Sequence, residues 1–435
     1  MAGELTVSIE KLVYGGDGLA HADGNTIFVP YVMPGEEVLV RPKSKKKTTM
    51  WAELAGVSVA SKERQKAKCP HFQKCGGCSY QHISAGEQLR LKKEILRETL
   101  SRIGGITWQG AIAEHTAEGY GYRNRAQWGV RSGMPRALGY FLPESSVILP
   151  IDECAVLSPK LAQTFGKLQE MARAGTLPVG IQEIEAFVDS ADEKVALNVA
   201  FEKYPKPAAE LAATFQAALP EIESLLLLDQ KKNRFELTGP GYLTHKAGGF
   251  DFRVSHLSFF QVNRFLTEDL LKTVTAGARG RTALDLYAGV GFFTLPLARS
   301  FETVVCVDAN LAATRDLYAN AEIAKVSVTT HNIHAEEFLK KTDLQPEFVV
   351  LDPPRAGMGA ECAAALANLG AAEIVYISCD PSTLARDLAV LLGTARAPKE
   401  MAAPKHRYEI SEVHLFDLFP QTFHLETLVR LRRIA

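Results

Sequence analysis

The stretch DLYAGVG, residues 285–291, ends an apolar run and places two glycines just ahead of a helical segment. Glycines at such a turn let the backbone approach a ligand at the N-terminus of the following helix. Four later apolar runs also end in polar or glycine-containing turns, namely TVVCVDAN (303–310), VSVTTHN (326–332), EFVVLDPP (347–354) and EIVYISCD (373–380). Because helical segments separate these runs, the sequence predicts a doubly wound, Rossmann-like parallel sheet that binds ligands at the carboxyl ends of its strands.

Two further apolar runs follow this sheet without a helix between them. They are VHLFDLFP (413–420) and FHLETLVRL (423–431). Strands joined so directly are expected to form an antiparallel hairpin, which would close the sheet. We assign residues 246–435 to this C-terminal domain.

The N-terminal part of the chain has a different rhythm. Short β-rich runs between residues 4 and 59 alternate with turns, which predicts a small antiparallel barrel of the OB type over residues 1–60. Residues 61–245 mix strand and helix patterns and form a predicted central α+β domain. It begins with a predicted helix at 84–105, capped by Ser84. The apolar stripe of that helix is Leu89, Ile95, Leu96, Leu100 and Ile103. The whole chain is thus expected to be a multidomain α/β protein.

The composition is that of an ordinary globular protein, with 46% hydrophobic and 23% charged residues in a chain of 435. Neither a secretory signal pattern nor an apolar stretch of about 18 residues is found, so we expect a cytoplasmic monomer without membrane contact. The formal net charge of −1 hides an asymmetry, because residues 1–150 hold 20 Lys/Arg against 14 Asp/Glu. This basic excess fits either a solvated face or a footprint for RNA.

Three cysteines lie within ten residues in the stretch CPHFQKCGGCSYQH (69–82). Thiols stay reduced in the cytoplasm, so such a cluster favours a metal site over disulfides. The spacing alone does not separate a zinc site from an iron-sulfur cluster. Both kinds of metal site therefore stay open at this point.

The glycine turn is followed by an acidic residue at the end of the second strand, Asp308, which would suit ribose hydroxyls. Two details favour S-adenosylmethionine over a nicotinamide cofactor. Position 294 is Thr, where a dinucleotide fingerprint has a third glycine, and the first strand carries its own carboxylate, Asp285. Carboxylates suit the ammonium and sulfonium charges of S-adenosylmethionine, which has no pyrophosphate to cradle.

The chemistry is expected at the ends of the fourth and fifth strands. Asp352, in LDPPR, is held by a stiff Pro-Pro turn at the edge of the cofactor. Cys379, in SCDPSTLARD, lies at a strand end beside a helix N-terminus, whose dipole favours a thiolate, with Arg386 a turn or two away. Cys306 and Cys362 are expected to be inert thiols.

A thiolate is needed when the methyl acceptor is a poor nucleophile, such as C5 of a pyrimidine. Sulfur adds to C6, C5 takes the methyl group, and a base removes the C5 proton so that sulfur leaves. The base should be a carboxylate that faces Cys379. Glu426, in FHLETLV, is the candidate, and its alternative role is an exposed strand carboxylate.

Several motifs together resemble the RNA 5-methyluridine methyltransferases, in particular the iron-sulfur branch that acts on 23S ribosomal RNA. The motifs are SFFQVN (258–263), DLYAGVGFFTLPLA (285–298), LDPPRAG, YISCDPSTLARD and HLETLV, and the N-terminal segment is similar to a TRAM domain. The resemblance spans nearly the whole chain. It implies an S-adenosylmethionine-dependent 23S rRNA (uracil-5-)-methyltransferase. Asp380 departs from the family's pattern, which often has Asn directly after the nucleophile.

The resemblance also implies roles for individual residues. Cys379 would be the nucleophile, and Glu426 would be the base that removes the C5 proton. The residues implied to contact S-adenosylmethionine are Gln261, Tyr287, Phe292, Asp308, Asn332 and Asp352. The residues implied to hold a [4Fe-4S] cluster are Cys69, Cys75, Cys78 and Cys154.

A uracil in folded RNA must be unstacked and swung into the pocket of the enzyme. Phe259, Phe260, Arg123 and Arg125 are candidates for that contact, or else they are core aromatics and part of a salt-bridged strand. Two other functions stay open beside 23S rRNA methylation. One is the same reaction on the TΨC loop of transfer RNA, and the other is that of a non-catalytic iron-sulfur RNA-binding protein.

Overall fold

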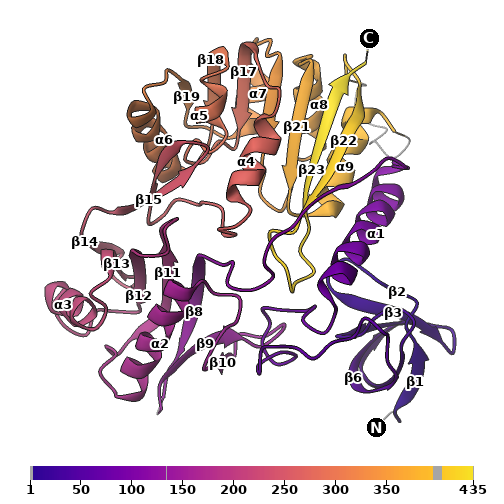
Figure 1. The fold of residues 1–435 in the computed structure, drawn as a ribbon, viewed down its shortest axis with the longest axis vertical. Coiled ribbons are helices and arrows are strands. Elements are labelled where there is room, and N and C mark those ends of the chain that lie inside the picture. The colour runs from indigo at the N-terminus through magenta and orange to yellow at the C-terminus, as the bar shows by residue number, and fades with distance from the viewer. Residues whose placement is uncertain (1–2, 134, 395–403, 435) are drawn as a thin grey trace. The chain divides into compact units, whose positions relative to one another are not determined.

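The computed structural model describes residues 3–133, 135–394 and 404–434. The chain divides into two compact units. The first runs to Glu98 and also includes segments 141–149 and 419–425, while the second includes 99–140, 150–418 and the segment from 426 onward. The boundary at Glu98 falls within helix α1 (Ala85–Gly104). Figure 1 labels the elements along the chain.

A six-stranded sheet builds the first unit, in the order β1-β5-β6-β4-β3-β2. Its strands are β1 (Leu5–Ser8), β2 (Lys11–Leu12), β3 (Asp17–Ala22), β4 (Asn25–Pro30), β5 (Glu37–Lys46) and β6 (Thr49–Val59). Five of these strands contribute to one core cluster, with members such as Val7, Ala20, Ile27, Val38 and Met50. Since alternate residues of a strand point to one face, the sheet must curl around this cluster.

The predicted strand-rich region forms a sheet, but the prediction that it is antiparallel throughout was wrong at one pairing. β4 pairs with β6 in parallel, so the sheet is mixed and not antiparallel throughout. β5 lies between β4 and β6 along the chain, so no tight turn joins β4 to β6 and forces them to be antiparallel. The strand order leaves β1 and β2 at the edges, so closure into a TRAM barrel stays a prediction.

Helix α1 confirms the predicted helix and most of its apolar stripe. Leu89, Ile95, Leu96 and Leu100 are buried, whereas Ile103 is 41% exposed. Including Ile103 was wrong because periodicity along a helix does not reveal where the covering surface ends. The hydroxyl of Ser84, the predicted cap, donates to the carboxylate of Glu63 across 2.6 Å.

Most of a seven-stranded sheet lies in the second unit, in the order β10-β9-β8-β11-β12-β13-β14. Its strands are β8 (Arg125–Arg131), β9 (Ala137–Phe141), β10 (Ile148–Pro150), β11 (Ile181–Val188), β12 (Val195–Phe201), β13 (Ile222–Asp229) and β14 (Arg234–Thr238). Its helices are α2 (Pro159–Arg173) and α3 (Ala208–Ala218). β12 and β13 pair in parallel on either side of α3, which forms a βαβ unit. A hairpin of β15 (Tyr242–Ala247) and β16 (Phe250–Ser255) follows.

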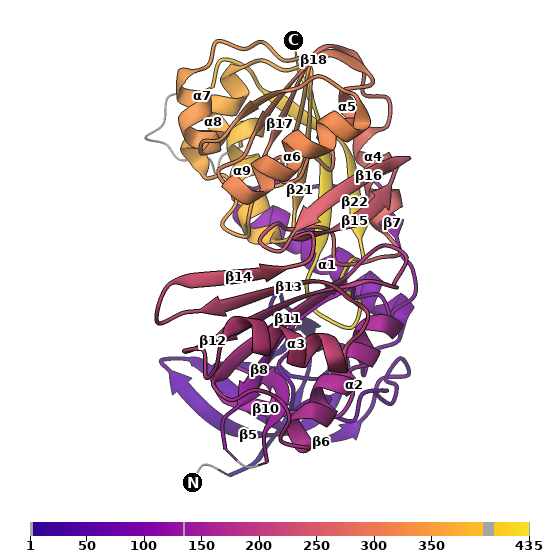
Figure 2. The ribbon, with the colours of Figure 1, turned by 90° about the vertical axis from the view of Figure 1, so that its left-hand side faces the viewer.

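The second unit also contains the predicted doubly wound sheet, in the order β19-β18-β17-β20-β21-β23-β22-β7. Its strands are β7 (Ala113–His115), β17 (Gly280–Leu286), β18 (Phe301–Val307), β19 (Thr329–His331), β20 (Phe348–Leu351), β21 (Glu373–Ser378), β22 (Tyr408–Phe416) and β23 (Glu426–Arg433). Its helices are α4 (Thr267–Thr275), α5 (Thr294–Leu297), α6 (Leu311–Ala324), α7 (Ala335–Lys341), α8 (Ala360–Asn368) and α9 (Pro381–Leu392). Figure 2 shows α7, α8 and α9 on one side of this sheet and α4 and α5 on the other.

The five predicted strands of this sheet pair in parallel, and β22 and β23 form the predicted antiparallel hairpin. The edge strand β7, which pairs with β22 in parallel, was not predicted. A strand of three residues has no periodicity that a sequence pattern could reveal. No helix in the described parts of the chain is long and apolar enough to span a membrane.

Candidate active site

Strand register brings four of the predicted cofactor residues to one edge of the eight-stranded sheet. The last parallel partners are Val307 with His331, Leu286 with Val307, and Leu286 with Leu351. The next residue on each of these strands therefore stands in one row along the carboxyl edge. That row consists of Asn332, Asp308, Tyr287 and Asp352.

Cys379 and Glu426 are brought together by the same kind of register. β21 and β23 are antiparallel neighbours whose outermost partners are Ser378 and Thr427. One residue further out, β21 leads to Cys379 and β23 begins at Glu426, so the two stand opposite each other. Since β20 pairs with β21 on its other side, this pair lies at the same edge of the sheet as Asp352.

The carboxyl groups at this edge resist ionisation. Glu426 is only 6% exposed, and burial together with the charge of Asp352 raises its pKa well above the usual value, against the guanidinium of Arg355. Burial also raises the pKa of Asp352. A carboxylate with a raised pKa is a stronger base than an ordinary one, which suits Glu426 for proton removal.

The thiol of Cys379 differs from the sequence-based expectation. Burial and the two neighbouring carboxyl groups raise its pKa to about 12, and Arg355 is the cation that acts in the opposite direction. Arg386, which was expected to favour the thiolate, instead pairs with Asp387 at 2.9 Å (Nε to Oδ1). The interpretation that a helix dipole and Arg386 favour a thiolate was therefore wrong, because desolvation outweighs the dipole and Arg386 is engaged elsewhere.

The glycine turn is tied to Asp308. Its carboxylate accepts hydrogen bonds from the backbone N–H groups of Gly289 (2.8 Å) and Asn310 (2.7 Å). The side-chain amide of Asn332 donates to the carbonyl oxygen of Asp308 at 2.9 Å. Gly291 has a φ of +91°, and a Cβ there would lie 3.2 Å from Leu317. These constraints fix both the turn and the acidic residue predicted to contact ribose.

Tyr287 is held in a left-handed backbone conformation, with a φ of +62°. For a residue with a side chain this costs on the order of 1–3 kcal/mol, and such strain gathers at functional sites. Burial and the nearby thiol of Cys362 raise the pKa of its hydroxyl. Burial raises the pKa of Cys362 to about 11 and raises that of Cys306 still further, as expected for inert thiols.

Three other residues singled out from the sequence are deeply buried. Asp285 is 1% exposed and accepts a hydrogen bond from the hydroxyl of Thr294 at 2.6 Å. Phe292 packs edge-to-face on Phe260, with ring centroids 5.4 Å apart. Gln261 is 9% exposed. Contact of Phe292 and Gln261 with the cofactor stays a prediction.

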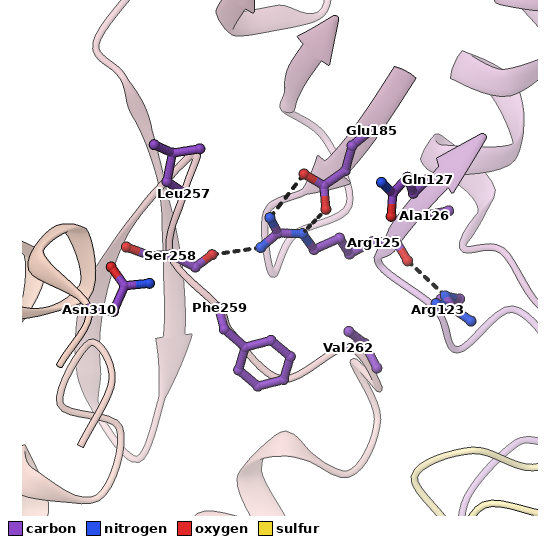
Figure 3. A pocket seen from close by; sticks show the side chains of 10 residues that line it. All are labelled: Arg123, Arg125, Ala126, Gln127, Glu185, Leu257, Ser258, Phe259, Val262 and Asn310. Carbon is purple, nitrogen blue, oxygen red and sulfur yellow. Dashed lines mark hydrogen bonds and ion pairs between the residues drawn. The ribbon is translucent and has the colours of Figure 1, made fainter. Parts of the chain in front are cut away.

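A pocket of about 330 Å³ lies in the same unit (Figure 3). The residues that line it are Arg123, Arg125, Ala126, Gln127, Glu185, Leu257, Ser258, Phe259, Val262 and Asn310. Asn310 comes two residues after Asp308, which links this pocket to the row at the sheet edge.

The four candidates for RNA contact differ in their exposure and in their bonding. Phe259 is 60% exposed in the pocket, whereas Phe260 is buried in an aromatic cluster. Arg125 is bound to Glu185 (2.7 and 3.1 Å), and it also donates to the carbonyl oxygen of Ser258 at 2.6 Å. Phe260 and Arg125 therefore take the structural roles that were the alternative, and Phe259 stays a candidate, as does Arg123, which also lines the pocket.

Comparisons with known proteins identify the family. The family model described as tRNA (uracil-5-)-methyltransferase matches residues 242–434. The chain is 31% identical, over 97% of its length, to the 23S rRNA (uracil(1939)-C(5))-methyltransferase RlmD of Pseudomonas entomophila and covers 92% of that protein. The chain belongs to the RNA uracil-5-methyltransferase family. It is thus a methyltransferase enzyme. The chain is also 31% identical to an uncharacterized RNA methyltransferase of Aquifex aeolicus, and the match covers 98% of both chains.

A solved structure shares the fold of this uracil-5-methyltransferase. It is the Pyrococcus abyssi tRNA (uracil-54, C5)-methyltransferase in complex with S-adenosyl-L-homocysteine. The two chains are 24% identical with a TM-score of 0.75, over 98% of this chain and all of the other. At this identity, the likeness shows that the two chains share a fold.

The cysteine cluster of this uracil-5-methyltransferase does not appear as a metal site. Cys69, Cys75 and Cys78 belong to the first unit and are half-buried, while Cys154 belongs to the second. Within the described ranges, no group of three or more His, Cys, Asp or Glu side chains could hold a metal ion. The structure therefore does not support the predicted [4Fe-4S] cluster. Spacing along the chain fixes neither the direction of thiols nor the place of a distant ligand such as Cys154.

The buried carboxyl group of Asp285 makes stability depend on pH. Burial is the main cause that raises its pKa from 3.8 to about 7. In this window the folded state holds a proton that the unfolded state has lost, so stability falls as pH rises from about 4 to about 7. Asp285→Asn removes this titration, and we expect the variant to gain on the order of a few kcal/mol relative to wild type across the window.

The measurement is the free energy of unfolding of both proteins in denaturant at several pH values. Asp343→Asn, at an exposed position in the same unit, controls for the loss of one carboxyl group. A difference between wild type and Asp285→Asn that stays constant with pH would contradict the prediction.

Proposed function

We propose that the enzyme transfers a methyl group from S-adenosylmethionine to C5 of a uracil in 23S ribosomal RNA. The observation that carries the proposal is the register that sets Cys379 opposite Glu426 beside Asp352. Relatives named as 23S rRNA (uracil-C5)-methyltransferases cover nearly the whole chain and favour ribosomal RNA. The second candidate is transfer RNA, which the matching family model and the Pyrococcus abyssi enzyme have in their names.

The carboxyl-edge row is the proposed site of S-adenosylmethionine, which supplies an electrophilic methyl group when it is bound. Asp308 is fixed by two backbone N–H groups and would accept hydrogen bonds from ribose hydroxyls. Asp352 would attract the positive charges of the cofactor, which would also lower the raised pKa of this carboxyl group. Tyr287, Asn332, Gln261 and Phe292 complete the proposed set.

In the proposed reaction, the sulfur of Cys379 adds to C6 of uracil and leaves C5 as an enolate carbon. The thiol is protonated near neutrality, since its pKa is about 12, so it must release its proton to solvent as the bond from sulfur to C6 forms. Once C5 carries the methyl group, Glu426 removes the C5 proton, and the bond from sulfur to C6 breaks. The guanidinium of Arg355 lowers the pKa of both groups and so favours their negative charge.

The unstacked uracil needs an exposed aromatic surface and polar partners. Phe259 offers the surface, because it is 60% exposed while its neighbour Phe260 is buried. Arg123 and Gln127 line the same pocket and bring hydrogen-bond donors to it. We propose this pocket as the entry of the target nucleotide.

The decisive experiment gives labelled S-adenosylmethionine to the purified enzyme with unmodified 23S rRNA and unmodified transfer RNA in parallel. We expect 5-methyluridine in 23S rRNA, measured by nuclease digestion and mass spectrometry. Cys379→Ala should abolish it. Glu426→Gln should lower turnover by about 10²–10⁴-fold, because the base is lost. This variant should also accumulate a covalent protein–RNA adduct, seen on a denaturing gel.

Cys306→Ala is the matched control, since it removes a buried thiol from within β18 and should leave activity intact. Label in transfer RNA alone would keep the mechanism and transfer the substrate assignment to the second candidate. Product from Cys379→Ala at the wild-type rate would refute the assigned nucleophile.

We propose that the N-terminal sheet is a further surface for RNA, which is one of the two interpretations of the basic excess in residues 1–150. Lys45, Lys46 and Lys47 are exposed where β5 turns into β6. Nearby on β6, Trp51 is 39% exposed and stacks on Phe28, with ring centroids 6.2 Å apart. Cations beside aromatic faces suit a single-stranded nucleic acid.

Replacing Lys45, Lys46 and Lys47 together by Gln should weaken RNA binding and flatten its dependence on salt. For single strands the slope changes by about 0.7 per lost phosphate contact, so we expect a decrease of roughly 2. Filter binding over a salt series measures it. The control triple replaces Lys272, Lys340 and Lys341, which each pair with a glutamate four residues earlier on a helix. If both triple variants show the same dependence of RNA affinity on salt, the N-terminal surface does not take part in RNA binding.

We also propose that Cys69, Cys75, Cys78 and Cys154 hold a [4Fe-4S] cluster. Support comes from the Cx5CxxC spacing and from the family resemblance. We expect iron and acid-labile sulfide in protein purified without oxygen, with loss of both in Cys78→Ala and retention in Cys306→Ala. Protein that is purified without oxygen and contains no iron would refute the cluster. If that protein still methylates RNA, the proposed reaction is unaffected.

A further inference from the structure

The loop that follows β20 carries Arg355. A tight turn joins the N–H of Gly357 to the carbonyl oxygen of Pro354 at 2.8 Å. Residues 354–356 are exposed, so burial of their side chains does not set the position of the loop. Arg355 nevertheless acts on the pKa of both Cys379 and Glu426, which requires a defined position.

One face of α9 makes three successive hydrogen bonds to this loop. The hydroxyl of Thr383 donates to the carbonyl oxygen of Arg355 at 3.1 Å. The guanidinium of Arg386 donates to the carbonyl oxygen of Ala356 at 2.8 Å. The carboxylate of Asp387 accepts from the N–H of Met358 at 2.9 Å. Positions three and four apart share a helix face, so α9 presents a continuous binding edge to the loop backbone.

The contact is rigid because Asp387 is itself fixed. Its side chain is fully buried, with one oxygen accepting from the hydroxyl of Tyr376 at 2.7 Å and the other from Arg386. Gly357 closes the approach, with a φ of +70°. A Cβ at Gly357 would lie 2.6 Å from Asp387 Oδ2 and 2.7 Å from Arg386 Nη2. No side chain fits between the loop and the helix at this point.

We infer that Arg386 and Asp387 are positioning residues that hold the loop at 355–358 so that Arg355 stays beside Cys379. The inference rests on the proposed function for the role of Cys379 as nucleophile. α9 begins at Pro381, directly after the Asp380 cap, whose carboxylate accepts from the N–H groups of Ser382 and Thr383. Helix α9 therefore positions both Cys379, which lies just before it, and Arg355, which is carried by the loop that α9 binds.

The test measures the alkylation of Cys379 by iodoacetamide in the free enzyme over a series of pH values, with site-specific mass spectrometry. Arg386→Met should slow alkylation at a given pH by about tenfold, because a displaced cation leaves less thiolate. Arg355→Met should slow it similarly. The double variant should be no slower than either single variant, since Arg386 acts through Arg355.

Arg281→Met is the matched control. It removes an exposed arginine paired with Glu347 in the same unit, far along the sequence from the loop, and should leave the alkylation profile unchanged. Asp387→Asn and Gly357→Ala probe the same contact and should repeat the effect of Arg386→Met if that variant folds poorly. Arg386→Lys, which keeps a donor for the carbonyl oxygen of Ala356, should restore part of the rate.

With RNA, Arg386→Met should lower kcat while KM for RNA stays near the wild-type value. If Arg386→Met, Asp387→Asn and Gly357→Ala all keep the wild-type alkylation profile, the inference is overturned and the contact is purely structural. An additive double variant would also overturn it, since Arg386 would then act independently of Arg355. Alkylation needs no RNA, so this result is separable from a failure of the proposed methylation.

Discussion

The antiparallel pairing of β21 with β23 is the constraint on which the candidate active site depends. A slip of one residue would turn every side chain of β23 to the opposite face and remove Glu426 from its place opposite Cys379. The register is secured by burial, because Thr427, Leu428 and Leu431 of β23 are fully buried. Parallel strands on one side supply the proposed cofactor row, and the antiparallel hairpin on the other supplies Glu426, the proposed base. The chemistry is therefore located where the sheet changes direction.

Electrostatics at this edge favour neutral groups in the free protein. Two carboxyl groups and a thiol lie in a desolvated place, and each has a raised pKa. Arg355 is the cation that reduces the resulting repulsion at Cys379 and Glu426, and it stands on an exposed loop. A site of this kind is assembled at a cost in stability, which the hydrogen bonds of α9 to the loop and the buried sheet offset.

The sequence predicted the parts of the fold that depend on periodicity and on local turns. The parallel sheet, the closing hairpin and the positions of Cys379 and Glu426 at strand ends followed from apolar runs and their terminal residues. It did not predict β7, which is too short for a pattern. It assigned the tuning cation to Arg386, because distance along a helix does not reveal that Arg386 pairs with Asp387. The sequence could bring the predicted cofactor residues together only because the carboxyl ends of parallel strands lie side by side at one edge of a sheet.

The order in which the chain is synthesised determines when the hairpin of β22 and β23 can form. Cys379, the proposed nucleophile, leaves the ribosome before the strand that carries Glu426, and β7 at 113–115 can pair only after β22 at 408–416 has been made. A nascent chain that has passed β21 has the thiol and the glycine turn but lacks the base. The sheet can be completed only by joining segments from distant parts of the sequence, which makes its assembly slow and global. A chain that ends before β23 therefore lacks the proposed base.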